Sequence, residues 1–224
     1  MTVLDQFSLK GKAAIVTGGE GMIGKMICET IKELGGDAIS IDIVETADQY
    51  CDITVFSDVL RLAGIPVDIL VNNAVGNQKA SESPYNRWEQ DLRIGLTGTA
   101  NVVRVLSDEL IKRKGVILNI GSDLSLIGPD QSLYQNGMVK PLSYSVVKHG
   151  IVGLTRYFAT LWPEVRCNCL CPGGVDVGQK VPHVPMGRLA RLEELKGPVA
   201  FLVSPASSYL TGSVLVADGG RTAW

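Results

Sequence analysis

The stretch Thr17-Gly18-Gly19-Glu20-Gly21-Met22-Ile23-Gly24 decides the fold of this chain. An apolar run at residues 13–17 precedes it and has the length of a buried strand. After it, apolar residues recur at steps of three and four up to Leu34, as in an amphipathic helix, and Gly35-Gly36 ends the pattern. Glycines at such a junction let the backbone turn sharply and let a pyrophosphate approach the free N–H groups of the helix. A tight turn without a ligand is the alternative, but a strand before and a helix after are the context that dinucleotide binding requires.

The alternation of strand and helix continues along the chain. Further apolar runs predict strands at residues 38–41, 68–72, 116–120, 166–171 and 214–217. Helical patterns separate them at residues 54–63, 84–114, 143–161 and 192–202, and we expect an interruption of the longest around Gly95 and Gly98. The pattern predicts an α/β protein with a mostly parallel sheet of six or seven strands. With helices on both faces, this is a doubly wound, three-layer Rossmann fold, and without repeat or linker we expect one domain over residues 1–224.

Composition and charge exclude several classes of function. The chain has 224 residues, of which 46% are hydrophobic, and a formal net charge of -2. There is no basic field to attract nucleic acid, and no apolar stretch approaches the length of a membrane span. The N-terminus lacks the features of a signal peptide, so we expect a cytoplasmic protein. The five cysteines and two histidines show no metal-ligand spacing; we expect no metal site and interpret Cys167, Cys169 and Cys171 as buried apolar residues.

Asp42 ends the second predicted strand. A carboxylate at this position accepts hydrogen bonds from both ribose hydroxyls of NAD and would repel the 2′-phosphate of NADP. Glu20 adds a second negative charge nearby, and no Lys or Arg follows Asp42. The prediction is NAD, with NADP disfavoured; a solvated strand end is the alternative for Asp42.

The helix after residue 141 begins Ser143-Tyr144-Ser145-Val146-Val147-Lys148. Tyr144 and Lys148, four residues apart, lie on one helical face. An ammonium beside a phenol favours the phenolate and lowers the pKa of the tyrosine, which would make Tyr144 a general acid and base at neutral pH. Taken alone, the pair is common and is usually a surface pair.

Taken together and in order, the motifs resemble the short-chain dehydrogenase/reductase family across essentially the whole chain. The matching elements are the glycine motif, Asp42, Asp52-Ile53, Asn72-Asn73-Ala74, Asn119-Ile120-Gly121-Ser122, Tyr144 with Lys148, Pro172-Gly173 and Asp218-Gly219-Gly220. The resemblance implies Ser122, Tyr144 and Lys148 as catalytic residues, with Ser122 polarising the substrate carbonyl and Tyr144 moving the proton. It implies hydride transfer between nicotinamide and a secondary alcohol or ketone.

The same resemblance implies the cofactor site and the assembly. The cofactor-binding residues would be Gly18, Gly21, Met22, Ile23, Gly24, Asp42, Asp52, Ile53, Asn73, Ala74, Tyr144, Lys148, Pro172, Gly173 and Val175. In the family, the helices predicted at residues 84–114 and 143–161 pair across subunits, so we expect a homodimer or homotetramer, with Arg156, Tyr157 and Trp162 as candidate interface residues.

The chain departs from the family pattern at four places. Met22 stands where the simple pattern has glycine, a spacing similar to the branch that acts on nucleotide sugars. Gly95 stands where the family has an Asn, whose backbone carbonyl holds a water that relays protons to the lysine. Residues 123–140 lengthen the segment between Ser122 and Tyr144 and are expected to protrude beside the active site, with Ser132 as the alternative serine. The stretch 175–185 is short, and its polar candidates are Gln179, Lys180 and His183.

A closer resemblance links the chain to a bacterial subgroup associated with flagellin-glycan and surface-sugar (nonulosonic acid) biosynthesis. It is carried by the long segment before Pro141-Leu-Ser-Tyr144, by Gly153-Leu-Thr-Arg-Tyr157 and by the end Gly-Gly-Arg-Thr-Ala-Trp224. The substrate implied is a sugar or a sugar phosphate. Two alternatives stay open: an NAD-using dehydratase or epimerase, suggested by the glycine spacing, and a catalytically weak dinucleotide-binding regulator, suggested by Gly95.

Overall fold

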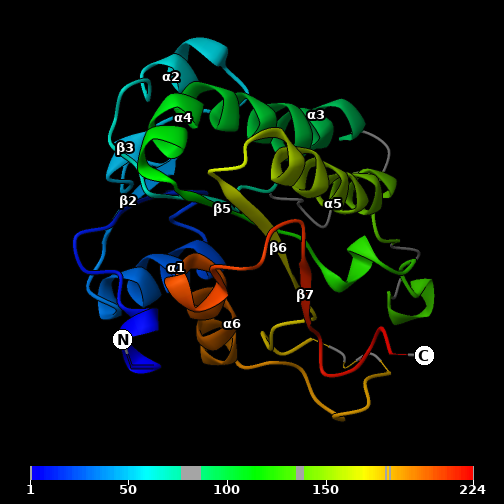
Figure 1. Ribbon diagram of the computed structural model, residues 1–224. Coiled ribbons are helices and arrows are strands. Elements are labelled where there is room, and N and C mark those ends of the chain that lie inside the picture. Colours follow the sequence, from blue (N-terminus) through cyan, green and yellow to red (C-terminus); the bar gives the residue numbers. More distant parts are fainter. Residues whose placement is uncertain (1, 77–86, 135–138, 180, 182, 224) are drawn as a thin grey trace.

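A single parallel sheet of seven strands runs through the computed structural model, which describes residues 2–76, 87–134, 139–179, 181 and 183–223 (Figure 1). The strands are β1 (Ala13–Thr17), β2 (Asp37–Asp42), β3 (Gln49–Tyr50), β4 (Ile69–Asn72), β5 (Val116–Ile120), β6 (Arg166–Pro172) and β7 (Val214–Ala217). Their order across the sheet is β3-β2-β1-β4-β5-β6-β7. All six predicted strands are confirmed. The seventh, β3, pairs only two residues with β2, which is too short for a hydrophobic period to show.

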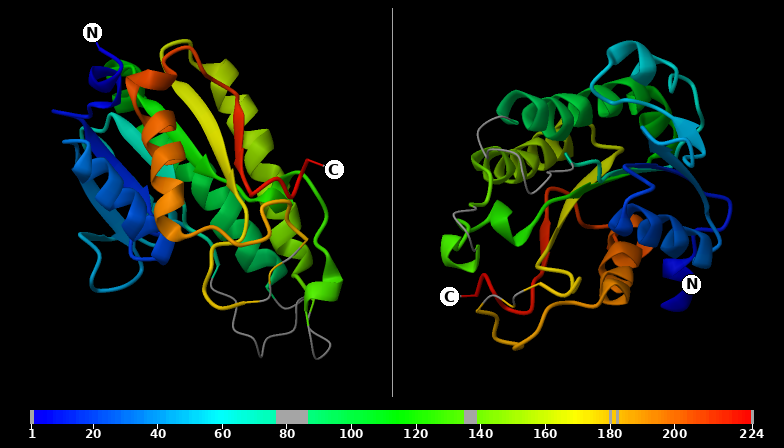
Figure 2. Two further views of the ribbon diagram at one scale, coloured as in Figure 1. Left: turned by 90° about the horizontal axis from the view of Figure 1, so that it is seen from below. Right: turned by 180° about the vertical axis from the view of Figure 1, so that it is seen from behind.

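Helices cover both faces of the sheet, so the predicted three layers are confirmed (Figure 2). One face carries α1 (Met22–Glu33) and α6 (Lys196–Val203), and the other carries α2 (Phe56–Leu60), α3 (Trp88–Leu92), α4 (Thr99–Arg113) and α5 (Leu142–Leu161). Successive strand residues point to opposite faces. Thus Val16 packs in the cluster under α1, and its neighbour Ile15 packs in the cluster under α4. In the described part of the chain, no helix has the length and apolarity to cross a membrane.

The interruption expected in the long helix is a π-helical turn, Arg93–Gly98, between α3 and α4. Both glycines of this turn permit close packing. A Cβ on Gly95 would lie 2.2 Å from Cγ1 of Val147 on α5, and one on Gly98 would lie 2.8 Å from Cγ1 of Ile53. Because Gly95 has no side chain, the backbone of the turn can pack closely against α5. Such single π turns inside α-helices are frequent at functional sites.

The sheet has a topological switch point between β1 and β4. From β1 the chain adds β2 and β3 on one side, then returns to place β4 on the other side of β1. In open parallel sheets of this kind, ligands bind in the crevice that opens beyond the carboxyl ends of the strands at the switch point. The glycine turn follows β1, and Asn73 follows β4, so both lie at this edge.

Candidate functional site

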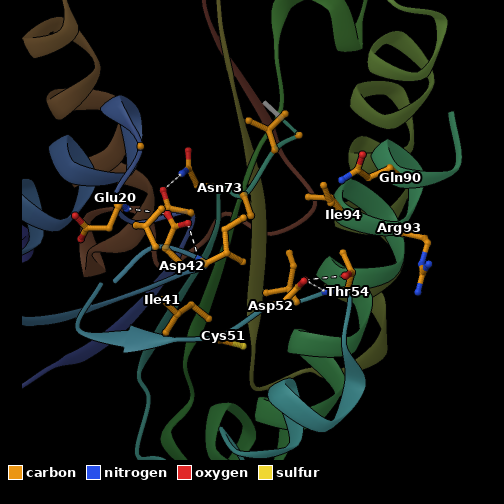
Figure 3. Close-up of a pocket in the computed structure, with 18 of the residues that line it drawn as sticks. Glu20, Ile41, Asp42, Cys51, Asp52, Thr54, Asn73, Gln90, Arg93 and Ile94 are labelled. Carbon is orange, nitrogen blue, oxygen red and sulfur yellow. Dashed lines mark hydrogen bonds between the residues drawn. The ribbon is translucent and has the colours of Figure 1, made fainter. Parts of the chain in front are cut away.

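A cleft of roughly 1380 Å³ opens at the carboxyl ends of β1, β2 and β4 (Figure 3). Pockets for small ligands usually measure about 300–1,000 Å³, so this cleft has room for a larger molecule. Glu20 and Asp42 lie on one side, and Gln90, Arg93 and Ile94 of the long helix lie on the other. The predicted cofactor residues in its walls are Gly18, Gly21, Met22, Ile23, Asp42, Asp52, Ile53, Asn73 and Ala74.

The glycines of the turn do different work. Gly18 has a φ of +60°, and a Cβ there would lie 2.8 Å from Cα of Ala74. A Cβ on Gly24 would lie 2.1 Å from the carbonyl oxygen of Gly18, so Gly24 lies behind the turn and outside the walls of the cleft. Gly21 is exposed, and a Cβ there would make only an ordinary contact, 3.4 Å from the carbonyl oxygen of Gly18. Gly21 precedes α1, whose N-terminus has no side-chain cap, so the first N–H groups of α1 are available to a phosphate.

Asn73 and Ala74 clamp the turn from the end of β4. The Thr17 hydroxyl oxygen accepts hydrogen bonds from the N–H groups of Asn73 and Ala74, both at 3.0 Å. The Asn73 side-chain amide donates in return to the carbonyl oxygens of Thr17 (3.1 Å) and Gly18 (2.9 Å). Thr17 was not among the predicted site residues, although its place directly before the glycines was the available signal.

Two carboxylates lie at the β2 end of the cleft. Asp42 is fixed at its rim because its carboxylate accepts hydrogen bonds from the backbone N–H of Glu20 (3.1 Å) and of Ile43 (2.7 Å). The Glu20 carboxylate accepts a hydrogen bond from the Ser40 hydroxyl at 2.9 Å. That bond is the main cause that lowers the pKa of Glu20 below its ordinary value, so Glu20 is ionised at neutral pH. This end of the cleft is therefore negative.

Ser122, Tyr144 and Lys148 converge beyond β5, as the sequence predicts. Ser122 follows β5, and its side chain accepts a hydrogen bond from the Leu124 N–H at 3.1 Å. The Ser122 side chain lies near enough to the Tyr144 hydroxyl to act on the pKa of that phenol. Lys148 Nζ donates to the carbonyl oxygen of Ile120 at 2.8 Å and lies 5.7 Å from the centroid of the Tyr144 ring. The pair on α5 is thus no surface pair, because Lys148 is buried.

The prediction that the lysine lowers the pKa of Tyr144 is wrong for the chain as it stands. Burial raises the pKa of Tyr144, and the Ser122 side chain only partly opposes this. Lys148 is itself deeply buried, and desolvation lowers its pKa to about 8. Tyr144 therefore keeps its proton at neutral pH, and the phenol is set to donate one.

Asp123, directly after Ser122, is a site residue that the sequence reasoning missed. One of its oxygens, Oδ1, accepts hydrogen bonds from the Ser122 hydroxyl and the Leu124 N–H, each at 2.8 Å. The other, Oδ2, pairs with Arg221 at 2.6 Å. Figure 1 shows how this contact arises, since the C-terminal segment (red) passes beside the segment that follows β5 (green). The signal was the unusual acidic residue after the serine.

The described ends of the segment at residues 123–140 lie beside the candidate catalytic residues, with Asp123 next to Ser122 and Lys140 next to Tyr144. The segment contains the 3-10 turns Asp123–Ser125 and Gln131–Leu133; residues 135–138 lie outside the described residues. Ser132 is exposed on the second turn, so Ser122 and not Ser132 lies beside Tyr144. Lys140, at the end of the insertion, lies with its Nζ 3.8 Å from the centroid of the Tyr144 ring.

Three predicted cofactor residues lie at the end of β6 and directly after it: Pro172 ends the strand, and Gly173 and Val175 follow. Gly173 N–H donates to the Ala217 carbonyl at 2.9 Å, and a Cβ on Gly173 would lie 2.8 Å from Cα of Asp218. Val175 is buried and bridges to Ala190. Pro172, Gly173 and Val175 therefore lie at the carboxyl edge, but outside the walls of the large cleft.

The structure describes two of the three polar candidates in the short stretch 175–185, Gln179 and His183. Gln179 does not face a substrate site, because its amide donates to the Val175 carbonyl at 2.6 Å and its oxygen accepts from the Val177 N–H at 2.8 Å. It braces its own loop. His183 is exposed, and Lys180 lies outside the described residues.

The model of the family described as Enoyl-(Acyl carrier protein) reductase matches residues 7–222. The chain is 29% identical to a 2-dehydro-3-deoxy-D-gluconate 5-dehydrogenase of Bacillus subtilis, over 96% of this chain and 96% of that protein. It is 32% identical to an NADP-dependent mannitol dehydrogenase of Alternaria alternata, over 96% and 94%. Among solved structures, a short-chain type dehydrogenase/reductase from Mycobacterium marinum superposes with a TM-score of 0.85 at 29% identity, over 99% of each chain.

Proposed function

Since the chain belongs to the short-chain dehydrogenase/reductase family, whose members oxidise CH–OH groups or reduce the corresponding carbonyl groups with a nicotinamide dinucleotide, we propose that it is an NAD-dependent oxidoreductase of a sugar-like secondary alcohol or ketone. The observation that carries the proposal is the convergence of Ser122, Tyr144 and Lys148 at the carboxyl edge of the sheet. The names of both relatives, a sugar-acid dehydrogenase and a mannitol dehydrogenase, support the substrate class. The single sheet supports one cofactor-binding domain over residues 1–224.

The cleft fits a dinucleotide, because a Cβ at Gly18 would meet Ala74 and the start of α1 is left uncapped. A bound nicotinamide would supply the carbon that accepts or gives the hydride. Tyr144 holds the proton that the reacting oxygen needs in reduction, and takes it up in oxidation. Ser122 donates to Asp123 here, so it must release this bond to donate to the reacting oxygen. The buried Lys148 ammonium then stabilises negative charge on the phenol.

The proposed catalytic role of Tyr144 is tested by Tyr144→Phe. Turnover of a panel of polyols and sugar acids with NAD should be abolished, because the proton carrier is lost, while NADH binding followed by fluorescence should be retained. Tyr157→Phe is the matched control, since Tyr157 lies on the same helix and is 60% exposed. Turnover of the Tyr144→Phe protein at the rate of the parent would refute the assignment.

The preference for NAD rests on two carboxylates of this chain. Asp42 and Glu20 lie at the ribose end of the cleft, and the nearby Lys25 is held by Glu20 at 3.3 Å. Of the described residues lining the β2 end, none is a lysine or arginine that would pair with a 2′-phosphate. Because the mannitol dehydrogenase is named as NADP-dependent, the preference is proposed from these residues and not from the relatives.

The ratio of kcat/KM for the two cofactors tests this preference. We expect NAD to be used more efficiently. Asp42→Ala should lower kcat/KM for NAD about ten- to a hundredfold, because hydrogen bonds to a charged group are lost. Asp37→Ala, at the exposed start of the same strand, is the control. A parent enzyme that favours NADP would refute the preference.

We further propose a homodimer or homotetramer that pairs through α4 and α5. Tyr157 is 60% exposed and Leu161 is 43% exposed on α5, which leaves apolar surface for a second copy. Trp162 instead stacks on Phe158 at 5.7 Å and belongs to the core of this chain. Light scattering coupled to size-exclusion chromatography measures the assembly, and a monomer at micromolar concentration would contradict it.

A further inference from the structure

Lys140 places an ammonium against the ring of the proposed proton carrier. Its Nζ lies 3.8 Å from the Tyr144 ring centroid, nearer than the 5.7 Å of Lys148. Lys140 is half-buried, and desolvation lowers the pKa of its ammonium, so keeping the charge here costs free energy. Within the described ranges, no ion pair joins Lys140 to a carboxylate. Among the described residues, the face of an aromatic ring is therefore the neighbour of this cation, and no carboxylate is paired with it.

The nearest acid cannot neutralise Lys140. Asp123 is the acidic group whose field acts on Lys140, but both of its oxygens are already used. Oδ2 pairs with Arg221 at 2.6 Å, and Oδ1 accepts from Ser122 and Leu124 at 2.8 Å. The negative charge of Asp123 is thus neutralised by the positive charge of Arg221. In the part of the chain that the structure describes, two ammonium groups without a paired carboxylate, Lys140 and Lys148, therefore lie around the Tyr144 ring.

We propose that Lys140 binds a carboxylate of the substrate, so that the enzyme acts on sugar-type hydroxy acids, such as aldonates or their keto forms, and not on neutral polyols. This inference rests on the proposed function, which places the reacting oxygen at Ser122 and Tyr144. From there, the ammonium lies within the length of a few carbon atoms, because it contacts the Tyr144 ring itself. Arg221 is already paired with Asp123, so Lys140 is the one of these two cations that is available to a substrate group other than the reacting oxygen. One cation suits a singly charged carboxylate, whereas phosphate is usually held by several donors.

Two substitutions isolate the charge of Lys140. Lys140→Met removes the charge and keeps an unbranched side chain, and Lys140→Arg keeps the charge. The Lys140 backbone N–H bonds to the Gln131 side chain at 2.8 Å, and neither substitution removes this anchor of the loop. Lys10→Met, at an exposed position, is the matched control. The midpoint of thermal unfolding, measured for each variant, shows that the fold is intact.

The test measures binding apart from turnover. D-gluconate and D-glucitol have carbon chains of equal length and differ at the terminal carboxylate. Each is titrated calorimetrically into the protein saturated with NADH, which cannot oxidise an alcohol. We expect gluconate to bind more tightly than glucitol to the parent protein. Lys140→Met should raise the Kd of gluconate about ten- to a hundredfold and leave that of glucitol within about twofold, and Lys140→Arg should retain most of the affinity.

Three results would overturn the assignment: equal affinity of the parent for both probes, an equal loss of both in Lys140→Met, or tighter Lys140-dependent binding of glucitol 6-phosphate than of gluconate. Turnover with NAD is measured in parallel. If gluconate binding depends on Lys140 but no alcohol or acid yields NADH, the proposed function fails and the carboxylate site stands. If alcohols are oxidised but gluconate and glucitol are not distinguished, the proposed function stands and the carboxylate site fails.

Discussion

Replacing Lys148 by methionine should stabilise the fold while it removes activity. The ammonium is buried, and its hydrogen bond to protein is the one to the Ile120 carbonyl at 2.8 Å. Desolvation lowers its pKa from the ordinary 10.5 to about 8. Each pKa unit corresponds to ~1.4 kcal/mol, so the charged group costs the folded chain roughly 3 kcal/mol near pH 7. Losing a hydrogen bond from a charged donor costs about 1.5–3 kcal/mol.

The difference leaves a net gain of up to about 1–2 kcal/mol for Lys148→Met, because methionine is similar in length and fills an apolar site. For a chain of this size, each kcal/mol raises the midpoint of thermal unfolding by about 2–4 °C. Scanning calorimetry of the cofactor-free protein measures the shift. Lys10→Met, which removes an exposed lysine, should leave the midpoint where it is.

The pH dependence makes the prediction sharper. Between about pH 8 and pH 10.5 the unfolded chain holds the Lys148 proton while the folded chain has lost it, so the parent gains stability as the pH rises through this window. Methionine does not titrate. The difference in the free energy of unfolding between Lys148→Met and the parent should therefore be largest near pH 7 and should shrink towards about pH 10. A variant less stable than the parent at about pH 7, or a gap that does not change with pH, would refute the reasoning.

Further predictions address the turn, the π helix and the phenol. Gly24→Ala should lower the free energy of unfolding by about 3 kcal/mol, since its Cβ would lie 2.1 Å from the Gly18 oxygen; an unchanged midpoint in urea would contradict this. Gly95→Asn should destabilise the fold through the Val147 side chain, and Val147→Ala in the same chain should recover part of the loss; strict additivity in a double-mutant cycle would count against the contact. Because burial raises the pKa of Tyr144, kcat for alcohol oxidation should rise with pH above neutrality and kcat for ketone reduction should fall; profiles that are flat in initial-rate assays would exclude the phenol as proton carrier.

The parts of the fold that follow from local pattern could be predicted from the sequence. The glycine turn after residue 17 and the interruption at Gly95 and Gly98 were predicted because glycine positions and hydrophobic periods are local signals. The strand β3 was not predicted, because a strand of two residues is too short to show an alternation of apolar and polar residues.

The parts of the site that depend on distant contacts could not be predicted. Arg221 reaches Asp123 across 98 residues of sequence, and no pattern along the chain encodes that approach. The predicted direction of the pKa shift of Tyr144 was wrong because the shift depends on burial, and the spacing of tyrosine and lysine gives no information on burial. Lys140 was missed for the same reason, since only the fold brings the end of the insertion over the ring.

The ion pair between Arg221 and Asp123 joins a late part of the sequence to the candidate site, whereas the cofactor cleft is built from an early part. The described residues that line the cofactor cleft all lie between Gly18 and Ile94, so they are synthesised first. The cation that holds Asp123, and with it Ser122, comes from the last strandless segment. All seven strands and all described residues lining the cleft precede Asp218, so a cut after Asp218 would separate from them only the segment that carries the Arg221 partner of Asp123. The residues that line the cleft and the residue that holds Asp123 are therefore separable along the chain.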